Sequence, residues 1–233
     1  MTTDDGRKDG PDVNEDEVWA AIDTGRTRIA DLLETMTPEE WDHPSLCQGW
    51  RVRDVAAHIP MGQEGLGPVL LGALRHPGPV NRVIRETARS RGALPTERLV
   101  ADLRATVGAR RPNLGVTYLE NLVDVLVHGQ DIAVPLRREL PVSLDAAAIA
   151  ATRVWSYRET RRGRKKARVF RSLPSEGYRF TATDVPWSAG EGPEVRGPVI
   201  AILLVLTGRP AGFSQLAGEG AARLAEHLDL ARS

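Results

Sequence analysis

The sequence lacks the features that mark several large classes of protein. Its single cysteine, Cys47, excludes an internal disulfide framework and a cysteine-rich metal site, and it fits a reducing compartment. The formal net charge is zero, so no overall field draws the chain toward nucleic acid or an anionic membrane. From composition alone we therefore expect no nucleic-acid partner.

Long apolar runs are also missing. The longest, residues 199–206, is well short of the ~20 residues that span a bilayer, and it predicts a buried helix. The polar start of the chain, residues 1–10, has none of the apolar core of a signal peptide. We therefore expect a cytoplasmic protein with no membrane partner, present as a monomer or a homodimer.

Apolar residues recur with helical period through the first two thirds of the chain. They predict helices over 13–37, from Val52 past His58, over 80–92, over 95–108, from a cap at Asn113 to Pro135, and over 143–155. Strand-like segments follow at 168–173 and 178–183, then an apolar helix over 198–207 and an amphipathic helix over 215–228. The predicted fold class is a helical bundle followed by a small α+β domain.

A change of composition near residue 158 suggests the domain boundary. We predict a disordered tail over 1–12, the helical bundle over 13–157 and the α+β domain over 158–233. Residues 158–171 contain eight basic residues and one acid, which raises the alternative of nucleic-acid binding with a steep salt dependence. Aromatic residues are sparse there, so a solvated connection between domains is the favoured interpretation.

The most informative segment of the chain holds Asp124 and His128, four residues apart inside an apolar run. Residues i and i+4 lie on the same face of a helix, so the carboxylate and the imidazole can converge on one cation. His58, within another predicted helix, offers a third ligand. Three nitrogen and oxygen ligands with an open fourth position are typical of a catalytic zinc-type site.

Each of these residues also has a structural interpretation. Asp124 and His128 could form a pair on a helix surface, or His128 could be a core histidine held by one hydrogen bond. Asp131, near the predicted end of the helix, could bond neighbouring backbone. The remaining histidines fit loop or surface positions: His43, His76 and His227.

Three motifs follow one another along the chain. They are Gln48-Gly-Trp50-Arg-Val-Arg-Asp54-Val-Ala-Ala-His58, then Asp124-x-x-x-His128-Gly-Gln130-Asp131-Ile-Ala-x-Pro135-Leu, then Gly197-Pro-Val-Ile-Ala-Ile-Leu-Leu-Val-Leu-Thr-Gly-Arg209 followed by Leu216-Ala-Gly-Glu-Gly. Together they resemble the mycothiol-dependent maleylpyruvate isomerase family. The resemblance spans nearly the whole chain and implies a DinB-like, metal-binding four-helix bundle joined to a small α+β domain.

The resemblance also implies roles for individual residues. The metal ligands would be His58, Asp124 and His128. Arg209 would face the site as the catalytic candidate and bind a substrate carboxylate through paired hydrogen bonds, although an arginine in such a setting is more often solvated or structural. Cofactor binding would fall to Trp50, Gln130 and Asp131, with packing of the preceding loop as the alternative for Trp50.

The implied function is that of a mycothiol-dependent isomerase or S-transferase in an actinobacterial-type cytoplasm. A divalent metal, most simply Zn²⁺, would stabilise the thiolate of mycothiol, which would then attack a small electrophile. The family's isomerase has a glutamate at the position of Asp124. That departure leaves a second hypothesis open, a non-catalytic metal- or ligand-binding regulator that keeps the bundle.

Overall fold

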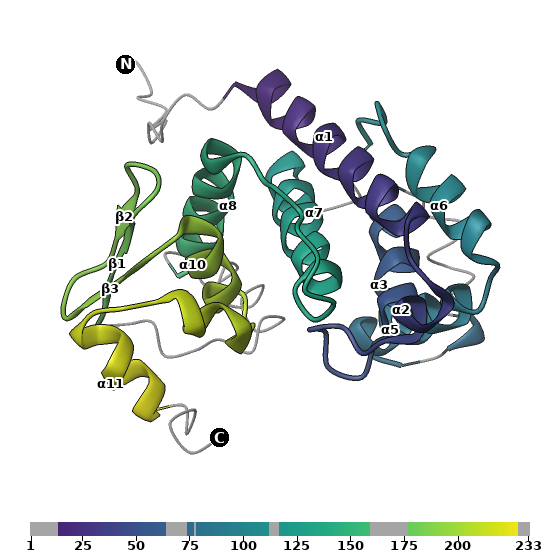
Figure 1. The fold of residues 1–233 in the computed structure, drawn as a ribbon. Helices are drawn as coiled ribbons and strands as arrows, with labels where there is room; N and C mark the ends of the chain where they lie inside the picture. Colours follow the sequence, from purple (N-terminus) through teal and green to yellow (C-terminus); the bar gives the residue numbers. More distant parts are fainter. Residues whose placement is uncertain (1–13, 64–73, 77, 112–116, 159–176, 228–233) are drawn as a thin grey trace.

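The structure, a computed structural model, describes residues 14–63, 74–76, 78–111, 117–158 and 177–227 (Figure 1). Its first part is helical. The elements are α1 (Glu15–Glu34), α2 (Pro38–Asp42), α3 (Val52–His58), the 3₁₀ turn η1 (Ile59–Gln63), α5 (Val80–Gly92), α6 (Thr96–Arg104), α7 (Tyr118–Ala133) and α8 (Leu144–Ser156). Helices lie in each predicted region, with three differences in their bounds. α3 ends at His58, where Ile59-Pro60 continues as the 3₁₀ turn, α6 ends at Arg104, and α7 begins later than predicted.

Two long helices form the centre of the helical part. α1 packs along α7, α3 packs against α5, α6 and α7, and α8 covers another side of α7 (Figure 1). The contact between α1 and α7 is apolar, with Ile22, Ile29, Leu122 and Leu126 all buried. Burial of such side chains contributes about 1.5–3 kcal/mol each, so the packing of α7 is strongly determined.

The start of α7 differs from the expected one. Its cap is Thr117, whose side chain accepts a hydrogen bond from the helix while Glu120 accepts one from the Thr117 backbone at 2.9 Å. This reciprocal capping box satisfies amide groups that have no partner inside the helix. Asn113, the predicted cap, lies outside the described residues, and the helix begins after it.

The second part of the chain contains a small sheet and three short helices. The strands are β1 (Arg179–Ala182), β2 (Ser188–Ala189) and β3 (Glu194–Gly197), and the helices are α10 (Val199–Leu206), the 3₁₀ turn η2 (Pro210–Gln215) and α11 (Glu219–His227). The strand order is β2-β1-β3, with β1 antiparallel to β2 and parallel to β3. The predicted strand over 168–173 and the basic run over 159–171 lie outside the described residues.

Helix α10 joins the second part to the first. It is apolar on almost every side, and it packs against α8, η2 and β1. The close contact with η2 depends on Gly212, since a Cβ there would lie 2.4 Å from the Ala201 carbonyl oxygen. α10 ends at Leu206, three residues before Arg209, so its packing helps to place this arginine.

The predicted fold class is therefore confirmed as a helical bundle followed by a small α+β unit. Among the described residues, no helix combines the length and the apolar character that crossing a membrane requires. The proposed boundary at residue 158 stays a prediction.

Candidate metal centre

The three predicted metal ligands meet between α3 and α7. His58 is the last residue of α3, and Asp124 and His128 lie one turn apart on α7. Asp124 Oδ1 is 3.2 Å from His128 Nε2 and 3.6 Å from His58 Nε2. The helical spacing brings the first pair together, and the packing of α3 on α7 supplies the third member.

These separations fit a divalent metal. Zinc lies ~2.1 Å from nitrogen and oxygen ligands, and a tetrahedron of that size holds its ligands about 3.4 Å apart. The two measured distances, 3.2 and 3.6 Å, lie on either side of that value. The side chain of Asp124 is 33% exposed, so the cluster has a side that a substrate can approach. His58, Asp124 and His128 could therefore hold a metal ion with an open position.

The indole of Trp50 forms one wall of this cluster. Its ring centroid lies 5.1 Å from that of His58 and 6.4 Å from that of His128. The loop that carries Trp50 is fixed by Ser45, whose hydroxyl donates to the Trp50 carbonyl at 2.9 Å. An aromatic ring in this position limits the approach of water on one side of the two imidazoles.

The other nitrogen of His128 faces a buried carboxylate. His128 Nδ1 lies 2.8 Å from Oδ2 of Asp131, whose side chain is 0% exposed. A carboxylate at Nδ1 keeps the proton on that nitrogen and leaves Nε2 to face Asp124. Asp131 thus orients His128 through the ring nitrogen that faces away from Asp124. The sequence suggests Asp131 for cofactor binding, but its side chain is fully buried in the structure.

Arg209 approaches the same carboxylate from the second part of the chain. Its Nε and Nη2 donate to Asp131 Oδ1 and Oδ2 at 3.0 and 2.7 Å, a bidentate pair. Burial alone would raise the pKa of Asp131, but the hydrogen bonds from His128 and Arg209 outweigh it and hold that pKa well below its usual range. The carboxylate is therefore ionised, and its charge is matched by a cation from the segment after α10.

The bonds of Arg209 limit what else it can bind. Besides Asp131, it donates through Nη1 to the Thr207 carbonyl at 2.7 Å and through Nη2 to Cys47 Sγ at 3.5 Å. A guanidinium group has five N–H donors. The sequence suggests that two guanidinium nitrogens of Arg209 bind a substrate carboxylate, but in the structure Nε and Nη2 already bond Asp131. A substrate role of Arg209 stays a prediction.

Cys47 is part of this network, which the sequence does not reveal. Its thiol donates to Asp131 Oδ2 at 3.0 Å, and its sulfur lies 3.7 Å from His128 Nδ1. Cys47, His128 and Asp131 are thus a second group of possible metal donors. In this second group, the charge of the Asp131 carboxylate is already balanced by the guanidinium of Arg209. A metal ion is therefore better accommodated beside Asp124.

Other predicted residues lie elsewhere. Gln130 is two positions from His128 on α7, and its amide donates to the Leu140 carbonyl at 2.9 Å, so it holds the segment after α7 rather than facing the cluster. Two histidines have the surface settings expected of them. They are His43, which bonds the Pro44 carbonyl, and His76, which bonds Ser90.

The chain has the DinB-like fold of maleylpyruvate isomerases. Residues 22–116 match the family model of the mycothiol maleylpyruvate isomerase N-terminal domain. The predicted resemblance is therefore confirmed: residues 22–116 of this chain are similar to the N-terminal domain of that family. Of the three predicted ligands, only His58 lies within the matched residues.

Solved structures give the same fold over most of the chain. The crystal structure of the mycothiol-dependent maleylpyruvate isomerase is 14% identical over 90% of this chain and 95% of its own, with a TM-score of 0.58. A histidine-to-alanine mutant of that isomerase is 13% identical with the same coverage, 90% and 95%, and a TM-score of 0.57. No curated protein matches the chain in sequence. At such identities the likeness establishes the fold.

The buried pair of Asp131 and Arg209 leads to a prediction on stability. Asp131→Asn removes the negative charge and leaves the Arg209 cation without a matching anion, so we expect a loss of about 3–5 kcal/mol in the free energy of unfolding. Urea denaturation of the metal-free protein measures this loss. Asp31→Asn makes the same chemical change at an exposed ion pair with Arg104, and we expect less than about 1 kcal/mol there. Equal losses in the two variants would contradict the assignment.

Proposed function

We propose that this protein is a metal-dependent, mycothiol-using isomerase or S-transferase that acts on a small electrophilic substrate. The observation that carries the proposal is the spacing of the Asp124 carboxylate from His58 and His128, which suits a divalent metal. The family domain over residues 22–116 supports the thiol cosubstrate. Zn²⁺ is the metal we propose, since two imidazoles and a carboxylate are ligands that catalytic zinc uses with one position open.

The residues around the cluster would divide the work. His58, Asp124 and His128 would hold the metal, which when bound supplies a positive charge that lowers the pKa of a thiol and keeps it as a thiolate at neutral pH. Asp131 would keep His128 in the tautomer that presents Nε2 to the metal. Trp50 would shield the imidazoles from water on one side.

The open side of the cluster would receive both the thiol and the electrophile. A thiolate held there can add to an electrophilic carbon, and the adduct can then eliminate the thiol as an isomerised product or keep it as a transferred group. Both reactions require the same groups from the protein. Arg209 would act mainly through Asp131, because its fork is engaged with that carboxylate.

A second function is favoured by two features of this chain. Asp124 is one methylene shorter than the glutamate of the family's isomerase, and Arg209 offers little of its guanidinium to a substrate. A protein of this fold could therefore bind a metal or a ligand without turnover and serve as a regulator. The two functions differ in whether an electrophile is consumed.

The first prediction concerns the metal. Protein purified without a histidine tag should contain about one zinc per chain by elemental analysis, because three ligands already lie at suitable spacing. His128→Ala should lose it, and His76→Ala, which removes a half-buried histidine that lies outside the cluster and bonds Ser90, should keep it. Equal zinc in all three proteins, or none in any after zinc is added, would refute the proposed centre.

A further prediction concerns pH. Burial alone would lower the pKa of His128, but the Asp124 carboxylate outweighs it and raises that pKa well above its usual range in the metal-free protein. Zinc must displace this proton, so its affinity should fall as the pH is lowered, with proton release on binding. Calorimetry in buffers of different ionisation enthalpy measures the protons released.

The same raised pKa has a consequence for stability. In the metal-free protein, the contribution of the His128 pair to the free energy of unfolding should be full below about pH 6.5, the ordinary pKa of histidine. It should be lost as the pH rises through the higher pKa of the folded state. A zinc affinity that does not fall as the pH is lowered from 8 to 6, with no proton released on binding, would contradict this protonation of His128.

Turnover separates the enzyme from the regulator. Zinc-loaded protein should consume a thiol-reactive electrophile, such as maleylpyruvate, only when mycothiol is present, and His58→Ala should remove this activity together with the zinc. A matched control is His43→Ala, an exposed histidine outside the cluster. Zinc binding and ligand binding without consumption of any electrophile would favour the regulator.

A further inference from the structure

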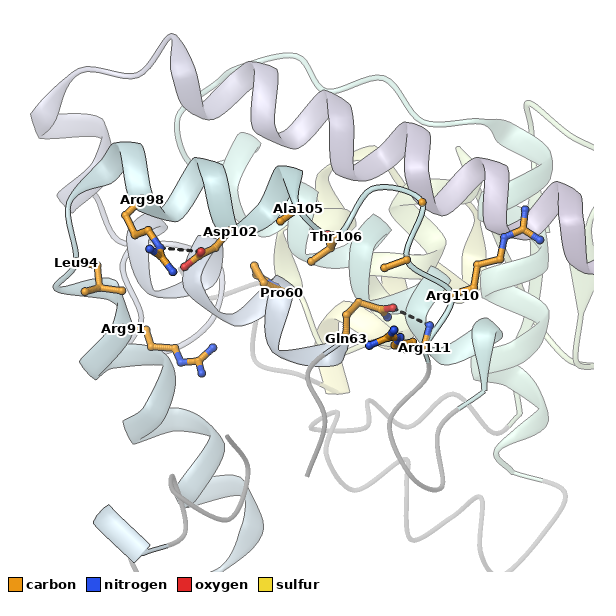
Figure 2. Close-up of a pocket in the computed structure, with 12 residues that line it drawn as sticks. Pro60, Gln63, Arg91, Leu94, Arg98, Asp102, Ala105, Thr106, Arg110 and Arg111 are labelled. Carbon is orange, nitrogen blue, oxygen red and sulfur yellow. Dashed lines mark hydrogen bonds and ion pairs between the residues drawn. The ribbon is translucent and has the colours of Figure 1, made fainter. Parts of the chain in front are cut away.

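A second cavity lies away from the metal centre and shares none of its residues. Its volume is about 740 Å³, large enough for an organic molecule of moderate size (Figure 2). It lies between η1, the end of α5, α6 and the segment after α6. The lining consists of Pro60, Gln63, Arg91, Leu94, Arg98, Asp102, Ala105, Thr106, Gly108, Ala109, Arg110 and Arg111.

Arginine is concentrated in this lining. Four of the twelve lining residues are arginines and one is an acid, Asp102. The whole chain has 28 arginines in 233 residues, about one in eight, so the cavity holds more than twice the average share. Because the net charge of the chain is zero, this concentration is a local property rather than a consequence of composition.

One wall of the cavity is fixed from behind by a buried cation. Arg26 of α1 is 2% exposed, and its Nη1 donates to the carbonyls of Thr106 and Ala109 at 2.7 and 3.2 Å. Its partner Asp23 accepts the Gly108 amide at 2.9 Å. The carbonyls of this wall therefore turn toward Arg26, and the segment 106–109 is held in one conformation.

The arginine side chains are positioned by specific bonds. Gln63 Oε1 accepts the Arg111 backbone amide at 3.1 Å, which fixes where the Arg111 side chain begins. Arg98 bonds Asp102 at 2.8 Å on α6. Arg110 turns away and bonds Asp16 of α1 at 2.6 Å, and in Figure 2 Arg91 and Arg111 extend toward one another from opposite walls.

We propose that this cavity is a binding site for a small organic polyanion, with two or more phosphate or carboxylate groups. Two guanidinium groups of the lining can donate paired hydrogen bonds to such groups: that of Arg111, on the segment after α6, and that of Arg98, through the nitrogens that do not bond Asp102. The apolar side chains of Pro60 and Leu94 offer contact to the carbon frame. Asp102, the single acid of the lining, is bonded to Arg98, and four arginines against one acid leave the formal charge of the lining positive.

Calorimetric titration with two probes, inorganic pyrophosphate and citrate, tests the proposal at constant ionic strength. One probe molecule should bind per chain, and the stronger probe identifies phosphate or carboxylate as the preferred group. Arg111→Gln should weaken binding about tenfold or more, since it removes charge-assisted hydrogen bonds. Arg196→Gln, which removes an exposed arginine on β3, makes the same change of charge and should leave the affinity unchanged.

Both probes also bind metals, so the His128→Ala protein serves as a second background. Binding that persists there and still falls with Arg111→Gln supports the cavity. Loss of binding in His128→Ala would instead place the anion at the metal centre and overturn the proposal. So would equal weakening by Arg111→Gln and Arg196→Gln, or no binding of either probe to the natural sequence. None of these outcomes depends on whether the protein has the activity proposed above.

Discussion

A carboxylate with no access to solvent must find all its hydrogen-bond donors inside the protein, and Asp131 finds them in three segments that lie far apart in the sequence. His128 comes from its own helix, Cys47 from the loop before α3, and Arg209 from the segment after α10. The position of this one charge therefore fixes the rotation of α7, the path of the loop and the docking of the second part of the chain. The orientation of His128 toward Asp124 follows from it.

The two sides of His128 explain why the site can be both stable and reactive. On the buried side, a negative and a positive charge neutralise each other where water is absent. On the exposed side, Asp124 and the two Nε2 atoms face a position that a metal and its substrate can reach. A metal ion on the exposed side would meet the Asp124 carboxylate and the Nε2 atoms of the two imidazoles. The Arg209 cation lies on the other side of His128, beyond Nδ1, where it is bonded to Asp131. The same helix thus supplies ligands and their support.

Local patterns in the sequence predict what depends on helical geometry, and they predict little of what depends on contacts between distant segments. The pairing of Asp124 with His128 follows from their spacing on one helix, and the same geometry could have shown that Gln130, two positions on, points to another face. His58 is proposed as a third ligand from its residue type and its helix, but no spacing in the sequence shows that it meets α7, and the family resemblance strengthens the proposal. Asp131 and Arg209 lie far apart in the sequence, and no periodic pattern in it predicts that their side chains meet.

Missed elements have similar causes. Strand β3 is four residues long and is fixed mainly by its parallel pairing with β1, so its own pattern is too short to reveal it. The capping box of α7 has a sequence signature, Thr117 followed three residues later by Glu120. The predicted cap is Asn113 instead, because asparagine is also a common cap and comes earlier in the chain. Cys47 gave no signal, because a lone cysteine has no spacing to interpret.

The reach of Arg209 across the molecule bears on how such proteins can diversify. A bundle of this kind cannot exchange its C-terminal unit freely with those of other chains, because the incoming unit must bring an arginine at the place where its apolar helix ends. A unit without it would leave the buried Asp131 carboxylate with its bonds from His128 and Cys47 but without a guanidinium counter-ion. Recombination between relatives should therefore preserve the aspartate and the arginine as a pair, or replace both together with side chains that need no counter-ion.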